Sequence, residues 1–339
     1  MWHAMSRRMP RKMSFVLPCL LLSLAFSQFL AAQQEAAPAK PDSAQVKADI
    51  AKAEKAAGTE WAREEQFFCG RPKGNRPDDP VLEPTKLFDN VYIIGRTGTA
   101  VYAIPTSTGI ILIDSGYQND VETVLLDGMK KLGLDPAQIK IVVITHGHTD
   151  HFGGAAYLQE HYGAHVYISQ ADWDLMEKPP VGRGGKAPKG PPPLLPKHDM
   201  VMAEGQSIVL GDEKINLVDI PGHTPGSMGL IFPVKDNGKT YTAAMFGGTM
   251  MGSVLVDPDE LLAQYGKSIA HFKEETKKAK VEVEFQNHPL YDNLQDKLAK
   301  LQARKKRDPN PFVLGQAHYQ GFVDVMGACL QTQVDRRKE

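Results

Sequence analysis

The run from 139 to 154 carries the residues whose chemistry is most specific in this chain. Its first seven residues are β-branched except for one lysine, which is typical of a buried strand. Three histidines and an aspartate follow within six positions: His146, His148, Asp150 and His151. Imidazole and carboxylate groups in a glycine-containing turn after a strand are typical of a metal-binding loop. We therefore predict that the first two histidines reach one metal ion, whereas the aspartate and the last histidine face a second ion.

Two further histidines also follow predicted strands directly. His223 lies in a Pro/Gly turn after the strand predicted at 214–220, and His288 follows the strand predicted at 281–285. Both are therefore candidate ligands on loops. For the run at 146–151, the alternative interpretation is a solvated histidine-rich loop. Other histidines fall on helix or strand patterns and are interpreted as structural: His161, His165, His271 and His318.

The elements that must position these residues are short strands separated by turns and helices. Strands are predicted at 90–95, 100–105, 109–113, 139–145, 165–169, 207–210, 214–220, 228–232, 240–246 and 281–285. Helices are predicted at 121–132, 154–161, 259–277, in the charged stretch up to about 306, and at 317–331. Turn residues between the first three strands favour antiparallel pairing. Strands, a helix and strands, repeated once, predict an α/β chain with two β-sheets sandwiched between helices.

The run at 146–151 resembles the His-x-His-x-Asp-His signature of the metallo-β-lactamase superfamily, and the turns at 221–226 and 286–289 resemble its later histidine motifs. The resemblance covers about 87–290 with the motifs in the right order, and it implies the four-layer αββα sandwich of that family. It also implies two zinc ions, although iron or manganese would accept the same nitrogen and oxygen ligands. The implied ligands are His146, His148 and His223 for one ion, and Asp150, His151 and His288 for the other.

Residues at two positions narrow the resemblance to one subclass of the superfamily. His151 follows the aspartate where the commonest acquired β-lactamases have arginine. Thr249, or Gly248 if the register slips by one, stands where glyoxalase II and many lactonases have a metal-bridging aspartate. A small hydroxyl residue there, together with His151, resembles subclass three of the class B β-lactamases. The corner that begins at Asp114 also resembles that subclass, and this carboxylate is either a turn former or a brace for the metal loop.

The implied activity is that of an exported zinc-dependent hydrolase, a β-lactamase that opens a cyclic amide in a small-molecule substrate and so confers antibiotic resistance. The nucleophile would be a water held as hydroxide by the two zinc ions, with Asp150 orienting it. The sequence contains no Gly-x-Ser-x-Gly motif for a serine nucleophile. One alternative is a related hydrolase acting on a lactone, thioester or phosphoester, because one fold hosts many chemistries. A zinc-binding protein without activity is a further alternative.

The N-terminus predicts export. Basic residues at 7–12 precede an uncharged run rich in Leu, Phe and Ala at 14–32, which ends in two alanines. This layout predicts a signal peptide at 1–32, and a retained membrane anchor is the alternative. We predict an N-terminal extension and loop at 33–86 and a hydrolase domain at 87–339. The mature protein would be periplasmic or secreted, without a stable membrane anchor.

Charge and cysteine content bear on partners and compartment. Signal cleavage changes the formal net charge from −1 to about −5, which is a poor basis for binding nucleic acid. We expect a monomer. Cys69 and Cys329 remain, and they are either a disulfide or two buried thiols.

The Gly/Pro/Lys-rich stretch at 179–196 is predicted to be a long surface loop, either a flap beside the substrate or a connector. This loop and the N-terminal extension depart from the resemblance and leave the substrate open.

Overall fold

The computed structural model of the chain describes residues 40–71, 78–178, 192–249, 251, 259–289 and 292–339. The predicted signal peptide at 1–32 and most of the predicted loop at 179–196 lie outside these residues. Asp42–Glu339 form one compact unit. Within the described residues, no helix is both long and apolar enough to cross a membrane.

The first β-sheet is mixed and has the strand order β1-β2-β3-β4-β5-β6-β7. Its first four strands pair antiparallel, and for β2 to β4 this confirms the pairing predicted from the turns between them. Its last four strands pair parallel, because helical segments carry the chain back between them. The strands are β1 (Thr85–Phe88), β2 (Val91–Gly95), β3 (Ala100–Thr106), β4 (Gly109–Ile113), β5 (Ile139–Val143), β6 (His165–Ser169) and β7 (Met200–Met202).

The second β-sheet has the strand order β12-β11-β10-β9-β8. Its strands β8 to β11 pair antiparallel, and β12 joins the edge in parallel to β11. The strands are β8 (Ser207–Leu210), β9 (Glu213–Asp219), β10 (Met228–Asp236), β11 (Lys239–Phe246) and β12 (Val283–Phe285).

The two sheets pack face to face through alternate residues of their strands. On β3, Tyr102 and Ile104 point into the core between the sheets, whereas Val101 and Ala103 belong to the core on the outer face. This alternation follows from the two-residue period of a strand. Because both faces are covered, strands such as β4 are apolar throughout rather than alternating.

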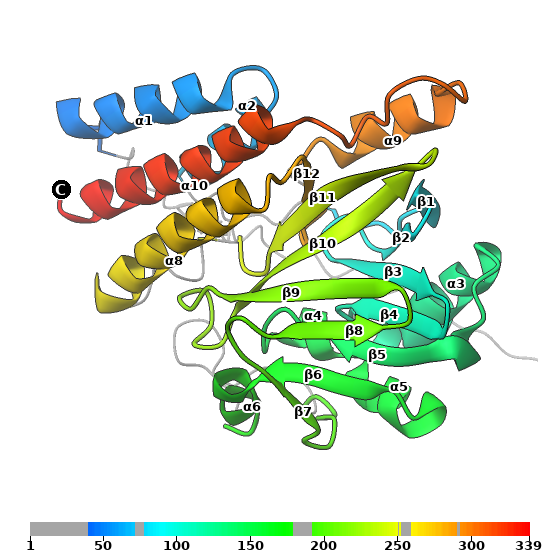
Figure 1. The fold of residues 1–339 in the computed structure, drawn as a ribbon. Helices are drawn as coiled ribbons and strands as arrows, with labels where there is room; N and C mark the ends of the chain where they lie inside the picture. The colour runs from blue at the N-terminus through cyan, green and yellow to red at the C-terminus, as the bar shows by residue number, and fades with distance from the viewer. Residues whose placement is uncertain (1–39, 72–77, 179–191, 250, 252–258, 290–291) are drawn as a thin grey trace, which may run out of the picture. The chain divides into compact units, whose positions relative to one another are not determined.

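Helices cover both outer faces and complete the predicted four-layer αββα sandwich (Figure 1). The first sheet is covered by the π-helical turn η2 (Val121–Leu126), α3 (Asp127–Lys131), α4 (Thr149–Phe152), α5 (Ala155–Tyr162) and α6 (Gln170–Met176). The second sheet is covered by α1 (Ala44–Ala57), α2 (Ala62–Phe68), α8 (Asp259–Lys278) and α10 (Gln316–Arg337). The charged helix predicted to end near 306 is α9 (Leu294–Ala303).

Segments from the two ends of this compact unit pack together on the second sheet. In Figure 1, α1 lies beside α10, which in turn lies beside α8. Cys69 and Cys329 form a disulfide with 4.5 Å between their Cα atoms, so the free-thiol alternative is excluded. Residues 42–71, which the sequence analysis separated from the hydrolase domain, thus share the apolar core of α8 and α10.

The short elements are where the structure departs from the sequence-based expectation. The strands β1 and β7 and the helix α6 were missed, since runs of three to seven residues carry too little periodicity to be recognised. The metal-loop strand was expected to reach residue 145, yet β5 ends at Val143. The physical reason lies at Thr145, whose backbone N–H bonds to the Asp114 carboxylate instead of a neighbouring strand.

Candidate metal centre

The end of β5 and the start of α4 place four of the predicted ligands within one short loop. The chain leaves the strand, turns through Gly147, and enters α4 with His148 as the residue that precedes the helix. Because α4 begins at Thr149, Asp150 and His151 lie in its first turn. This local path separates the first two histidines from the aspartate and the third histidine.

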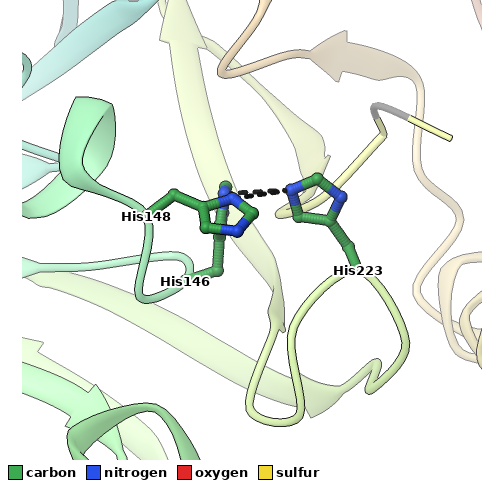
Figure 2. Close-up of side chains that lie close together, drawn as sticks. All are labelled: His146, His148 and His223. Carbon is green, nitrogen blue, oxygen red and sulfur yellow. Dashed lines mark hydrogen bonds between the residues drawn. The ribbon is translucent and has the colours of Figure 1, made fainter. Parts of the chain in front are cut away.

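His146, His148 and His223 converge on one point, as Figure 2 shows. The Nε2 atom of His223 lies 3.2 Å from Nε2 of His146 and 3.1 Å from Nδ1 of His148. These separations are compatible with three lone pairs directed at a single ion. His146 is fully buried and His223 nearly so, which leaves His148 as the more accessible member of the group.

Asp150, His151 and His288 form a second group. The Nε2 atom of His151 lies 3.1 Å from Nε2 of His288 and 3.6 Å from Oδ2 of Asp150. The same Oδ2 atom lies 3.9 Å from Nε2 of His288. The two groups are adjacent, with 4.0 Å between the ring centroids of His146 and His151. All six residues predicted from the sequence are therefore brought together in two neighbouring triads.

A buried aspartate fixes the orientation of His151. The Oδ2 atom of Asp114 lies 2.7 Å from Nδ1 of His151, and a carboxylate accepts, so this nitrogen carries the proton and Nε2 is left with its lone pair. Asp114 adopts a φ of 60° and also accepts the Thr145 backbone N–H. Both interpretations of Asp114 from the sequence thus hold: it turns the chain and it braces the metal loop.

The hydroxyl of Thr145 takes part in the hydrogen bonds that orient His146. It donates to Asp114 at 3.0 Å and accepts from Nδ2 of Asn287 at 3.0 Å. The same oxygen lies 3.2 Å from Nδ1 of His146, so that nitrogen is the donor and Nε2 of His146 keeps its lone pair. On the other side of the site, Nδ1 of His288 donates to the carbonyl oxygen of Gly98, which again leaves Nε2 free to bind.

The loop of His223 is held by close packing against α8. A side chain at Gly222 would overlap Tyr265, and the hydroxyl of Tyr265 donates to the carbonyl oxygen of Gly248 at 2.7 Å. A Cβ atom at Gly248 would lie 2.6 Å from Cβ of His223, so any larger residue there would displace this histidine. Thr249 is buried and donates to Oε1 of Gln286 at 3.2 Å, outside both triads.

The surroundings set the charge of the six side chains. Burial lowers the pKa of His146 and His223 well below its ordinary value, and neighbouring histidines add to the effect. Burial likewise lowers the pKa of His148 and of His288 to about 4. His151 differs, because the carboxylates of Asp150 and Asp114 outweigh burial and raise its pKa. Burial acts to raise the pKa of Asp150, but the nearby histidines, His151 first, outweigh it and lower the pKa to about 2.

The donor set fits a pair of zinc ions. One triad offers three imidazole nitrogens and the other offers two nitrogens and a carboxylate oxygen. Zinc takes nitrogen and oxygen ligands of these types, and a site with three protein ligands leaves a coordination position open. The buried carboxylate of Asp114 behind His151 is the type of outer partner that orients ligand histidines.

Sequence reasoning missed one residue that contacts both ligand loops. Asp172, in the first turn of α6, is fully buried and accepts hydrogen bonds from the loops of His148 and His223. The available signal was Ser169, whose side chain accepts the backbone N–H of Asp172 and starts the helix.

Part of the chain is similar in sequence to known proteins. Residues 94–236 match the family model of the metallo-beta-lactamase superfamily. Probable metallo-hydrolase YflN of Bacillus subtilis is 27% identical over 168 residues, which cover 44% of this chain and 62% of YflN. Hydroxyacylglutathione hydrolase GloC of Haemophilus influenzae is 31% identical over 133 residues, which cover 37% of this chain and 57% of GloC. The chain thus spans less than two thirds of the length of either curated relative.

Solved structures match over a larger part of the chain. BJP-1, a subclass B3 metallo-beta-lactamase of Bradyrhizobium japonicum, has a TM-score of 0.61 at 25% identity, and the match covers 83% of this chain and 94% of BJP-1. The metallo-beta-lactamase GOB-18 from Elizabethkingia meningoseptica has a TM-score of 0.59 at 25% identity, covering 79% of this chain and 97% of GOB-18.

Proposed function

We propose that this chain, which belongs to the metallo-beta-lactamase superfamily, is a zinc-dependent hydrolase that opens the amide bond of a β-lactam ring. The observation that carries the proposal is the pair of adjacent triads, one of three histidines and one of an aspartate and two histidines. We further propose that the substrate is a small molecule, that the protein acts as a monomer and that it is exported.

The residues of the two triads would share the work of metal binding and positioning. His146, His148 and His223 would hold the first zinc, and Asp150, His151 and His288 the second. When bound, the two ions would supply Lewis acidity and lower the pKa of a water towards about 7. Asp150 is ionised at neutral pH, because its pKa is lowered to about 2, so its carboxylate would accept a hydrogen bond from the attacking water. That contact orients the water towards the carbonyl carbon.

The absence of a metal-bridging carboxylate at Gly248 and Thr249 favours a β-lactam over other substrates. In the described residues, neither Gly248 nor Thr249 offers a carboxylate or a thiol, and Thr249 bonds to Gln286. Glyoxalase II and many lactonases have a metal-bridging aspartate at the position of Thr249 or Gly248. Proteins of similar fold include BJP-1, a subclass B3 metallo-beta-lactamase. We therefore rank the β-lactam amide first.

A thioester is the second candidate substrate. GloC, at 31% identity, is named a hydroxyacylglutathione hydrolase, so sequence similarity supports this alternative. The packing of Gly248 against His223 weighs against it, because an aspartate at this position would displace a residue of the first triad. Within the same superfamily, a lactone or phosphoester remains a related alternative with the same metal requirement.

A substrate panel tests the proposal. The zinc-loaded protein is assayed on a penicillin, a carbapenem, an acyl-homoserine lactone and a hydroxyacylglutathione thioester, with and without a chelator. We expect hydrolysis of both β-lactams, abolished by the chelator and restored by zinc. Turnover of the lactone or thioester that exceeds β-lactam turnover by orders of magnitude would reverse the ranking. No β-lactam turnover with two zinc ions bound would refute the proposed activity.

A further inference from the structure

One buried carboxylate joins the two loops that carry His146, His148 and His223. Asp172 Oδ2 accepts the backbone N–H of Gly147 at 2.7 Å. The same carboxylate accepts the hydroxyl of Thr224 at 2.6 Å and the backbone N–H of Gly226 at 2.8 Å. Gly147 lies between two members of the first triad, and Thr224 follows the third directly in the sequence.

The chain makes room for this carboxylate on both loops. A Cβ atom at Gly147 would lie 3.3 Å from Cβ and Cγ of Asp172, which is tighter than ordinary contact. At Gly226 a Cβ atom would overlap the hydroxyl oxygen of Ser169 and lie 2.9 Å from Cγ of Asp172. Glycine at these two positions therefore lets both loops approach α6 closely enough to donate.

The hydrogen-bond chemistry requires an acceptor-only side chain. All three partners of Asp172 are donors, and an ionised carboxylate is the side chain that accepts from several donors without offering one. An asparagine of the same shape would direct an amide N–H₂ at one of these donors. The Asp172 side chain is fully buried, so a lost partner would not be replaced by bulk water.

We propose that Asp172 is a positioning residue for the first metal site, where it sets the separation between the His146–His148 loop and the His223 loop. This inference rests on the proposed zinc function in that it takes the first triad to be a metal site. Asp172 contacts none of the six proposed ligands in the hydrogen bonds above, and it acts through the backbone of their loops. Asp114 has the corresponding role for the second triad, where it contacts His151 directly.

The proposal predicts an effect on the first site that a general loss of stability would not produce. Without Asp172, the three imidazoles of the first triad would still be present, but their loops would be free to separate. The first metal ion should then bind more weakly by roughly 10–100-fold, which is the typical loss when an outer partner of a metal ligand is removed. Excess metal should restore occupancy, whereas it would not restore a protein that had lost its fold.

The experiment compares Asp172→Asn with Asp174→Asn in the full protein. Asp174 is a matched control because it lies on the same helix and its side chain bonds to Gln170 at the exposed surface. Stepwise cobalt(II) titration, followed by the visible absorption spectrum, and competition with a chelator give the affinity of each site. We expect Asp172→Asn to weaken the first site by about 10–100-fold and to change the spectrum, and Asp174→Asn to behave as the wild type.

A wild-type first-site affinity and spectrum in Asp172→Asn would overturn the inference. If that variant does not fold, Thr224→Val decides, since it removes one of the three donors; a wild-type first site in it overturns the inference, and a weaker first site supports it. The outcome is independent of the proposed activity. A wild-type protein that binds metal but hydrolyses no β-lactam would refute the activity and leave this result in place.

Discussion

Two buried polar clusters in this protein differ in the cation that balances their negative or lone-pair-bearing groups. The first is the pair of triads at the candidate metal centre. The second, the carboxylate–lysine cluster, consists of Glu64 on α2, Glu284 on β12, Asp292, and Lys297 on α9, and all four are almost completely buried. In each triad, imidazole nitrogens and carboxylate oxygens converge within 4.8 Å of one another, as ligands around an external ion would. In the carboxylate–lysine cluster, the chain supplies its own cation.

The hydrogen bonds differ in the same sense. At the metal centre, Nδ1 of His146, His151 and His288 each has a partner, so the opposite nitrogen is directed at the site. In the carboxylate–lysine cluster, Nζ of Lys297 lies 3.8 Å from Glu284 and 5.2 Å above the ring of Trp61. Within the described residues, neither carboxylate oxygen of Glu64 has a hydrogen-bond partner.

The electrostatics of the two clusters follow from this difference. Burial raises the pKa of Glu64 to about 8 and that of Glu284 well above its ordinary value, so protons balance the excess negative charge. Burial opposes the charge of Lys297, yet the carboxylates raise its pKa. We infer that the first cluster is built to take up an external cation, whereas the second is closed around an internal one and serves stability.

Removing the internal cation should have the largest effect. Lys297→Ala leaves the three buried carboxyl groups without this cation, so any of them that is ionised loses its partner, and the loss of one partner of a buried ion pair costs about 3–5 kcal/mol of unfolding free energy. The loss should be smaller at pH 5 than at pH 8, because the carboxylates can take up protons. Denaturant unfolding measures it, with Lys300→Ala on the exposed face of α9 as the control. A loss below about 1 kcal/mol would show that Lys297 stabilises the fold no more than an ordinary surface ion pair does.

The next largest effect concerns the two roles of Asp150. In the proposed function it holds the second zinc and orients the water, whereas His288 only holds the zinc. At saturating zinc, Asp150→Ala should therefore turn over more slowly than His288→Ala, by about 100-fold, because the nucleophile is no longer oriented. The steady-state rate on a β-lactam, measured over a zinc titration, checks this. Equal rates for the two variants would show that Asp150 is a ligand only.

A pH-dependent change in stability should follow from Glu64. Its pKa of about 8 lies above the ordinary 4.5, so the folded protein keeps a proton that the unfolded chain releases. The resulting stabilisation is complete below pH 4.5 and is lost as the pH rises through 8. Glu64→Gln removes this dependence, so the variant should gain about 3–4 kcal/mol relative to the wild type between pH 5 and pH 8.

Denaturant unfolding at the two pH values measures this gain. Glu260→Gln at an exposed position of α8 is the control for the removal of a carboxylate outside the cluster. If the Glu64→Gln difference is independent of pH, Glu64 does not carry a proton in the folded protein, and the charge balance of the carboxylate–lysine cluster would have to be reassigned.

The smallest effect is expected at Thr249, which lies beside the candidate metal centre and belongs to neither triad. Thr249→Ala removes a hydrogen bond to Gln286 and should cost about 1 kcal/mol of unfolding free energy. Zinc stoichiometry and β-lactam turnover should equal those of the wild type. A variant that binds fewer than two zinc ions would show that Thr249 contributes to the metal centre after all.

How much the sequence predicted depends on how local each feature is. The order of layers and the six converging residues were predictable, because His146 to His151 are contiguous and His223 and His288 follow strands with clear patterns. In the carboxylate–lysine cluster, Glu64 is far in the sequence from the other three members, and each member taken alone resembles a solvated surface charge. Asp172 was missed for a similar reason, since its partners are backbone groups of loops that only the fold brings to α6.

The cysteine pair and the short strands show two further limits. The sequence left a disulfide and two buried thiols equally open, because pairing depends on a Cα separation that only the packing of α2 against α10 sets. The edge strands β1 and β7 are three or four residues long, and their pairing is decided by neighbouring strands rather than by their own side chains.

The most direct test of the comparison is an anomalous diffraction measurement at the zinc edge on crystals grown with zinc. We expect one peak among His146, His148 and His223, a second among Asp150, His151 and His288, and no peak at Glu64, Glu284 and Asp292 beside Lys297. A missing peak at either triad, or a peak within the carboxylate–lysine cluster, would contradict this expectation.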